Sequence, residues 1–126
     1  MFNFTYHRSS GVLQVSVDGS WTLDEVQCYA RDAGTQFAAA RKQSGSLRLL
    51  IDLAAAHVLS QELMDPLATA GMQYARADDR VALAVGSTLL KLQMRRMLGD
   101  APVPIFLSTK EAMNWLLSDD KAGAVG

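Results

Sequence analysis

Residues 47–53 read Leu-Arg-Leu-Leu-Ile-Asp-Leu, a short apolar run that decides the fold. Parallel strands are buried on both faces, so they lose the alternation of polar and apolar residues, and this run is typical of such a central strand. Residues 80–86, Arg-Val-Ala-Leu-Ala-Val-Gly, form a second continuous apolar run of strand length that ends in glycine. Both runs predict buried strands of one sheet.

Helical patterns flank these two runs. Thr22-Leu-Asp-Glu25 is a capping box, and apolar residues follow it at helical spacing as far as Ala40. Residues 54–59 are expected to form a loop. Ser60 can cap a second helix, although Asp65-Pro66 is a rival start because proline suits the first helical position.

The remaining elements extend the same alternation. Residues 88–98 predict a third helix, and Ser108-Thr-Lys-Glu111 is a second capping box that opens a fourth. Residues 103–107 predict a last strand, and the prolines beside Val103 indicate a sheet edge or the entry of a strand rather than the centre of the sheet. At the N-terminus, residues 2–7 and 13–18 alternate with a period of two, which predicts a β-hairpin.

The order ββαβαβαβα predicts the α/β class, with a mixed, mainly parallel sheet and helices packed on it. We expect one domain over residues 1–120 and a flexible tail over residues 121–126, because the tail has no apolar periodicity.

Charge and composition exclude several classes of function. Twelve basic and thirteen acidic residues give a net charge of −1, so no general attraction to nucleic acid is expected. Cys28 is the single cysteine and the chain has two histidines, so neither a disulfide nor a metal site is predicted. The sequence shows no signal peptide and no apolar run of membrane length, so we expect a cytoplasmic protein without membrane insertion.

The sequence resembles the STAS domains, and in particular their SpoIIAA-like branch. The segments that carry the resemblance are residues 15–22, residues 47–53, residues 80–86 and residues 105–116, Ile-Phe-Leu-Ser-Thr-Lys-Glu-Ala-Met-Asn-Trp-Leu. The resemblance covers roughly residues 1–118. It implies a non-enzymatic module that binds regulatory proteins, or one that holds small or lipid-like ligands.

The chain departs from the family where STAS regulators carry a phosphoacceptor serine. The corresponding tract reads Val58-Leu-Ser-Gln-Glu-Leu63, which keeps a serine but lacks the glycine of the family motif. Ser60 is therefore either a phosphorylated switch residue or a plain helix cap, and the cap is the stronger interpretation.

A hydrolase could be inferred from Asp52, His57 and Ser60, since Asp52 is expected to end a central parallel strand, where ligands of open α/β sheets bind. Catalytic triads are assembled from distant segments, however, and the chain has no Gly-x-Ser-x-Gly motif. We therefore predict no catalytic residue and no cofactor. Asp78 and Asp79 are expected to be solvated boundary residues.

The third helix carries more apolar residues than one buried stripe needs, and its charged residues are all basic. Lys91 and Arg95 share a face one turn apart, and Met94 offers adaptable packing. Trp21, between the hairpin and the first helix, is expected to cover the core or to line a pocket with Tyr29 or Tyr74.

Three hypotheses of function follow. The first is an interaction or regulatory module, expected to form a homodimer, that binds through the third helix and the loop around Ser60. The second is a domain that binds a small apolar or lipid ligand in a pocket near Trp21, His57 and Met94. The third, an enzyme, has the least support.

Overall fold

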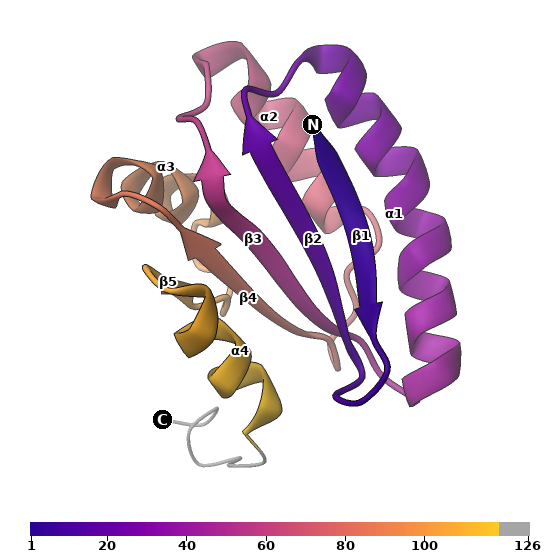
Figure 1. The fold of residues 1–126 in the computed structure, drawn as a ribbon. Coiled ribbons are helices and arrows are strands. Elements are labelled where there is room, and N and C mark those ends of the chain that lie inside the picture. Colours follow the sequence, from indigo (N-terminus) through magenta and orange to yellow (C-terminus); the bar gives the residue numbers. More distant parts are fainter. Residues whose placement is uncertain (119–126) are drawn as a thin grey trace.

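The computed structural model describes residues 1–118, and the tail predicted over residues 121–126 lies outside this range. In the described part of the chain the elements follow the predicted order (Figure 1). They are β1 (Phe2–His7), β2 (Val12–Gly19), α1 (Leu23–Ser44), β3 (Arg48–Ala56), α2 (Gln61–Met72), β4 (Arg80–Val85), α3 (Thr88–Leu98), β5 (Ile105–Phe106) and α4 (Thr109–Leu117).

The strands form one five-stranded sheet in the order β1-β2-β3-β4-β5. β1 pairs with β2 antiparallel, and the other neighbours are parallel. The run at residues 47–53 supplies the central strand, in which Leu49 faces Leu13 of β2 and Val81 of β4. The α/β class and the mixed, mainly parallel sheet are therefore confirmed.

The helices cover the two faces of the sheet unequally. α1, α2 and α3 lie on one face, and α4 lies on the other (Figure 1). The first face holds the larger part of the core, with side chains such as Leu13, Val15, Leu49 and Leu83 beneath the three helices. Side chains alternate between faces along each strand, so the neighbours Leu50 and Ala82 pack under α4 instead.

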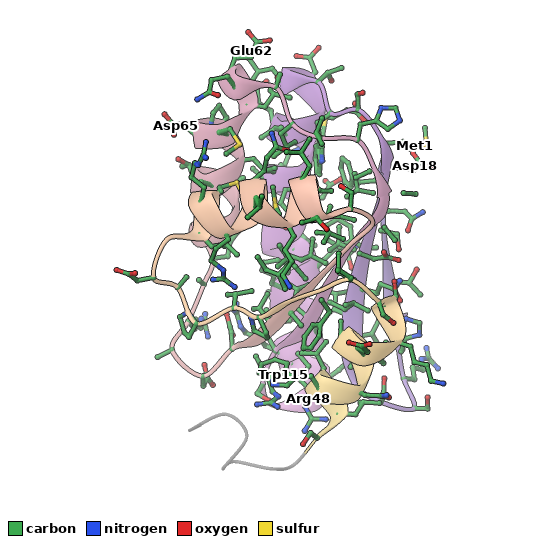
Figure 2. All side chains as sticks on the ribbon, turned by 90° about the vertical axis from the view of Figure 1, so that its left-hand side faces the viewer. Met1, Asp18, Arg48, Glu62, Asp65 and Trp115 are labelled. Atoms are coloured by element: carbon green, nitrogen blue, oxygen red, sulfur yellow. The ribbon has the colours of Figure 1, made fainter. Side chains whose placement is uncertain are left out.

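Local hydrogen bonds explain where two helices begin. The Thr22 hydroxyl accepts from the Glu25 amide at 3.1 Å, and the Glu25 carboxylate accepts from the Thr22 amide, so the predicted capping box is formed. The Met1 ammonium lies 2.7 Å from Glu25 and 3.6 Å from Asp18, which ties the start of β1 to the start of α1 (Figure 2). Ser108 caps α4 by accepting from the Glu111 amide at 3.3 Å.

Two predicted boundaries are wrong, and of the two starts predicted for α2 the one at Ser60 is confirmed. Residues 54–56 belong to β3 and not to a loop, because β2 is long enough to pair Gly19 with Ala56 after a bulge. β5 covers two residues instead of residues 103–107, since Pro104 has no N–H to donate to the sheet. α2 begins at Gln61, so Pro66 lies inside the helix and does not start it.

Candidate functional site: an apolar cavity between the sheet and three helices

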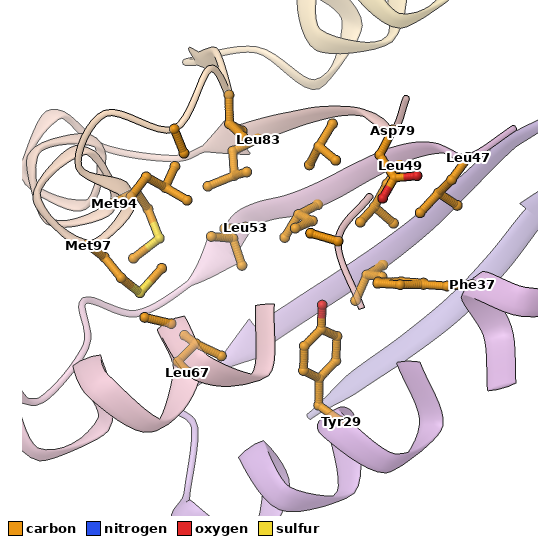
Figure 3. A pocket seen from close by; sticks show the side chains of 18 of the residues that line it. Tyr29, Phe37, Leu47, Leu49, Leu53, Leu67, Asp79, Leu83, Met94 and Met97 are labelled. Carbon is orange, nitrogen blue, oxygen red and sulfur yellow. The ribbon is translucent and has the colours of Figure 1, made fainter. Parts of the chain in front are cut away.

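The helices on the larger face do not cover the sheet completely. α2 packs against α1 and also contacts α3, which lies over β4 and β5, and the space between these helices and the sheet is not completely filled. Leu49 and Ile51 of β3 face this gap, together with Val81 and Leu83 of β4. The result is an apolar cavity of about 360 Å³ (Figure 3).

Hydrocarbon and thioether side chains make up most of the cavity wall, and Trp21, Tyr29, Arg76 and Asp79 add its polar side-chain atoms. The residues that line it are Val15, Val17, Trp21, Tyr29, Phe37, Leu47, Leu49, Ile51, Leu53, Leu67, Ala68, Ala75, Arg76, Ala77, Asp79, Val81, Leu83, Met94, Met97, Leu98, Ala101, Pro102 and Val103. Ligand pockets typically measure about 300–1,000 Å³ and are walled by apolar side chains with a few polar groups. This cavity has that size and that composition.

The mouth of the cavity lies where its lining residues become exposed. Residues 75–77, in the loop that follows α2, are exposed, and so is Pro102 in the loop that follows α3. The Arg76 guanidinium has no hydrogen bond or ion pair with another residue of the described chain. A positive charge therefore stands at the mouth while the interior is apolar.

A buried ion pair holds this rim in place. Asp79 accepts two hydrogen bonds from Arg41 of α1, at 2.6 and 3.3 Å, and a third from the Arg76 amide at 2.8 Å. Arg41 also donates to the Tyr74 carbonyl at 2.8 Å. The side chain of Asp79 is 5% exposed, so the prediction that it is a solvated boundary residue is wrong.

Tyr29 enters the cavity from the opposite side, on α1, and Figure 3 shows its hydroxyl directed toward the sheet. The ring stacks on Phe4 with centroids 6.0 Å apart and makes edge contacts with Phe2 at 5.8 Å and Trp21 at 5.6 Å. Burial raises the pKa of Tyr29 to about 12, so the hydroxyl keeps its proton at neutral pH. These aromatic contacts fix the direction in which the hydroxyl points.

Three of the residues predicted for a pocket line this one, namely Trp21, Tyr29 and Met94. Trp21 stacks on Phe2 at 5.8 Å and is 9% exposed, so it covers the core and borders the cavity at once. Met94 of α3 is buried in the wall. His57 is not part of the lining; its Nδ1 hydrogen-bonds the Ser20 hydroxyl at 2.9 Å at the edge of the sheet.

Asp52, His57 and Ser60 do not form a hydrogen-bonded set within residues 1–118. Asp52 lies inside β3, not at its end, on the face away from the cavity, and accepts from Gln14 at 3.2 Å and from Thr109 at 3.4 Å. Ser60 is the N-cap residue of α2, but its hydroxyl makes no capping hydrogen bond. Although these three residues are close in the sequence, the fold does not bring their side chains into hydrogen-bond contact.

α3 has the expected excess of apolar surface. Leu89 is 59% exposed and Leu92 is 60% exposed, and Lys91 is exposed between them. Arg95 is exposed as well, and it donates to the Val103 carbonyl at 2.8 Å, which fastens α3 to the loop at the cavity mouth. The basic residues of this helix thus lie outside the cavity.

Other kinds of site find little support in the described residues. They contain no group of three or more side chains that could hold a metal ion. Among the described helices, none combines the length and the apolar character that crossing a membrane requires.

The residues that form and support the cavity rim, which sequence reasoning missed, lie far apart in the chain. Arg41 and Asp79 are separated by 38 positions, and no local pattern indicates that they pair. Arg76 carries no signal beyond its charge in a loop. The sequence does predict Tyr29 as a candidate pocket residue beside Trp21, but its hydroxyl can only be placed once β1, α1 and Trp21 are packed together.

Comparison with known proteins adds no assignment, because no family model and no curated protein sequence matches the chain. The resemblance to STAS domains therefore stays a prediction.

Proposed function

We propose that this chain binds a small apolar ligand between its sheet and helices α1, α2 and α3. The observation that carries the proposal is the cavity of about 360 Å³ with an almost wholly apolar wall. Proteins close-pack their interiors, so an apolar space of this size is a feature that ordinary packing would remove. An apolar ligand in the cavity would bury its own apolar surface and that of the wall, and this burial would stabilise the complex.

The size of the cavity sets the size of the ligand. An engineered apolar cavity of about 150 Å³ binds benzene, so by proportion a cavity of about 360 Å³ accommodates roughly 14 carbon atoms. A medium-length acyl or isoprenoid chain, or a fused ring system, fits this limit. The mouth at residues 75–77 allows part of the ligand to extend into solvent.

A binding titration tests the proposal with a neutral dye that fluoresces in apolar surroundings, such as Nile red, on three proteins. In Ala68→Leu the added side chain projects from α2 into the cavity, and we expect affinity to fall about tenfold or more. The matched control is Ala38→Leu on the exposed side of α1, for which the dissociation constant should stay within about twofold. Equal binding by all three proteins would contradict the proposal.

A second candidate is docking of a partner protein through α3, as the first hypothesis from the sequence states. The exposed leucines Leu89 and Leu92 favour it, together with Val58, which is 47% exposed. Exposed apolar residues grouped beside polar ones are typical of interaction surfaces. Native mass spectrometry separates the two candidates: a co-purified apolar compound supports the first, and a mass of twice the chain without a ligand supports the second.

A further inference from the structure

Tyr29 brings one polar atom into the middle of an apolar site. The residue is 4% exposed, and its hydroxyl has no hydrogen-bond partner in the part of the chain that the structure describes. Contacts with Phe2, Phe4 and Trp21 hold the ring in place. Figure 3 shows the hydroxyl directed toward the sheet. Buried hydroxyl groups in proteins are normally hydrogen-bonded, and this one is directed at the space a ligand would fill.

The unpaired hydroxyl distinguishes between kinds of apolar ligand. A pure hydrocarbon in the cavity would exclude water from the Tyr29 hydroxyl and leave it without a partner, which is unfavourable. A ligand with an oxygen atom at this point would form the missing hydrogen bond. The ligand should therefore be amphiphilic rather than a hydrocarbon.

The charges around the cavity indicate that the ligand's buried oxygen is uncharged. Arg76 is the one basic residue among the described residues that line the cavity, and the ring contacts of Tyr29 are with other aromatic side chains, so the lining offers a buried carboxylate little compensation. Arg41 is already paired with Asp79 at 2.6 Å. Arg76 is exposed at the mouth, where water competes for its charge.

We propose, on the basis of the proposed function, that the natural ligand is an uncharged amphiphile whose hydroxyl or carbonyl oxygen hydrogen-bonds Tyr29. Its apolar part fills the space between Leu49, Leu83 and Met94, within the limit of roughly 14 carbon atoms set by the cavity. Long-chain alcohols, ketones and isoprenoid alcohols have this chemistry. Tyr29 then determines specificity, since it selects for one oxygen in an otherwise apolar molecule.

The test uses three probes with ten carbon atoms each: decanol, decanoate and naphthalene, measured by displacement of Nile red. In Tyr29→Phe the ring and its aromatic contacts remain and the hydroxyl is lost. We expect the affinity for decanol to fall about three- to tenfold, as for the loss of one hydrogen bond, and the affinity for naphthalene to change less than about twofold. Unchanged affinity for decanol, with naphthalene still bound, would overturn this inference and leave the proposed function intact.

Tyr6→Phe is the matched control, because Tyr6 lies outside the cavity lining and its hydroxyl pairs with Ser44. This variant should bind all three probes as the unaltered chain does. If decanoate bound more tightly than decanol, and Arg76→Gln abolished this preference, the inference of an uncharged ligand would be wrong and an anionic ligand would be indicated. Failure of the unaltered chain to bind any probe, naphthalene included, would refute the proposed function itself.

Discussion

The two faces of the sheet are packed in different ways. Under α4, six residues are completely buried, and three of them are alanines, which let the helix approach the strands closely: Val12, Leu50, Ala82, Ala84, Ala112 and Leu116. On the other face, three helices and larger side chains enclose a cavity of about 360 Å³. One short helix over small residues thus packs closely on the sheet, whereas the three helices on the other face leave a cavity.

This difference in packing indicates that one face mainly contributes stability and the other provides space for a ligand. Close packing under α4 makes that face a source of stability, since each buried methyl group there has a full set of neighbours. The cavity face gives up part of the same stabilisation because its wall lacks contacts on one side. A binding site is expected where packing is incomplete, and three experiments test this contrast.

The largest effect should come from shortening a leucine on each face. Leu116→Ala under α4 removes a side chain with 0% exposure, and we expect a loss of ~3–5 kcal/mol in the free energy of unfolding. Leu67→Ala on α2 borders existing space and should cost ~2–3 kcal/mol, because fewer contacts are lost. Urea denaturation of both variants measures the difference, and equal losses would remove the contrast between the faces.

An effect of intermediate size should appear in alkaline solution. Unfolded tyrosine ionises near pH 10, whereas Tyr29 in the folded chain has a pKa of about 12. Above pH 10 the unfolded chain releases this proton and the folded chain retains it, so stability falls as pH rises from 10 to 12, by up to ~2–3 kcal/mol. Tyr29→Phe should lose less stability over this interval, as measured by urea denaturation at several pH values. An equal loss of stability in both proteins between pH 10 and 12 would show that the Tyr29 hydroxyl is hydrated in the folded chain.

The smallest effect should come from adding volume. Ala112→Leu forces a larger side chain between α4 and the sheet, and we expect a loss of ~1–3 kcal/mol. Ala68→Leu makes the same change in a helix that borders the cavity, so its stability should stay within about 1 kcal/mol of the unaltered chain. Thermal unfolding monitored by circular dichroism compares the two. A larger loss for Ala68→Leu would show that the cavity cannot accept additional atoms.

Sequence patterns predicted the elements that depend on local physical chemistry. The apolar runs at residues 47–53 and 80–86 became β3 and β4, and the third helix has its predicted bounds at Thr88–Leu98. The capping box at Thr22 is formed by side chains three positions apart, so the sequence alone contains it. Such features need no information about distant parts of the chain.

Boundaries that depend on a neighbouring strand were less predictable. The end of β3 was placed at residue 53, but pairing with Gly19 of β2 extends the strand to Ala56. At Gly34 in α1, a Cβ atom would lie 2.9 Å from the ring of Tyr74. The glycine makes room for a side chain 40 positions away in the sequence, which no local pattern reveals.

The sequence by itself determined the alternation of strands and helices, and with it the α/β class, because hydrophobic periodicity and capping act over a few residues. Tertiary structure alone decided where the cavity lies, that Asp79 pairs with Arg41, and that the Tyr29 hydroxyl points inward without a partner. These features arise where helices meet the sheet at particular distances and angles. Those distances result from all side chains packing together, so no single segment of the sequence encodes them.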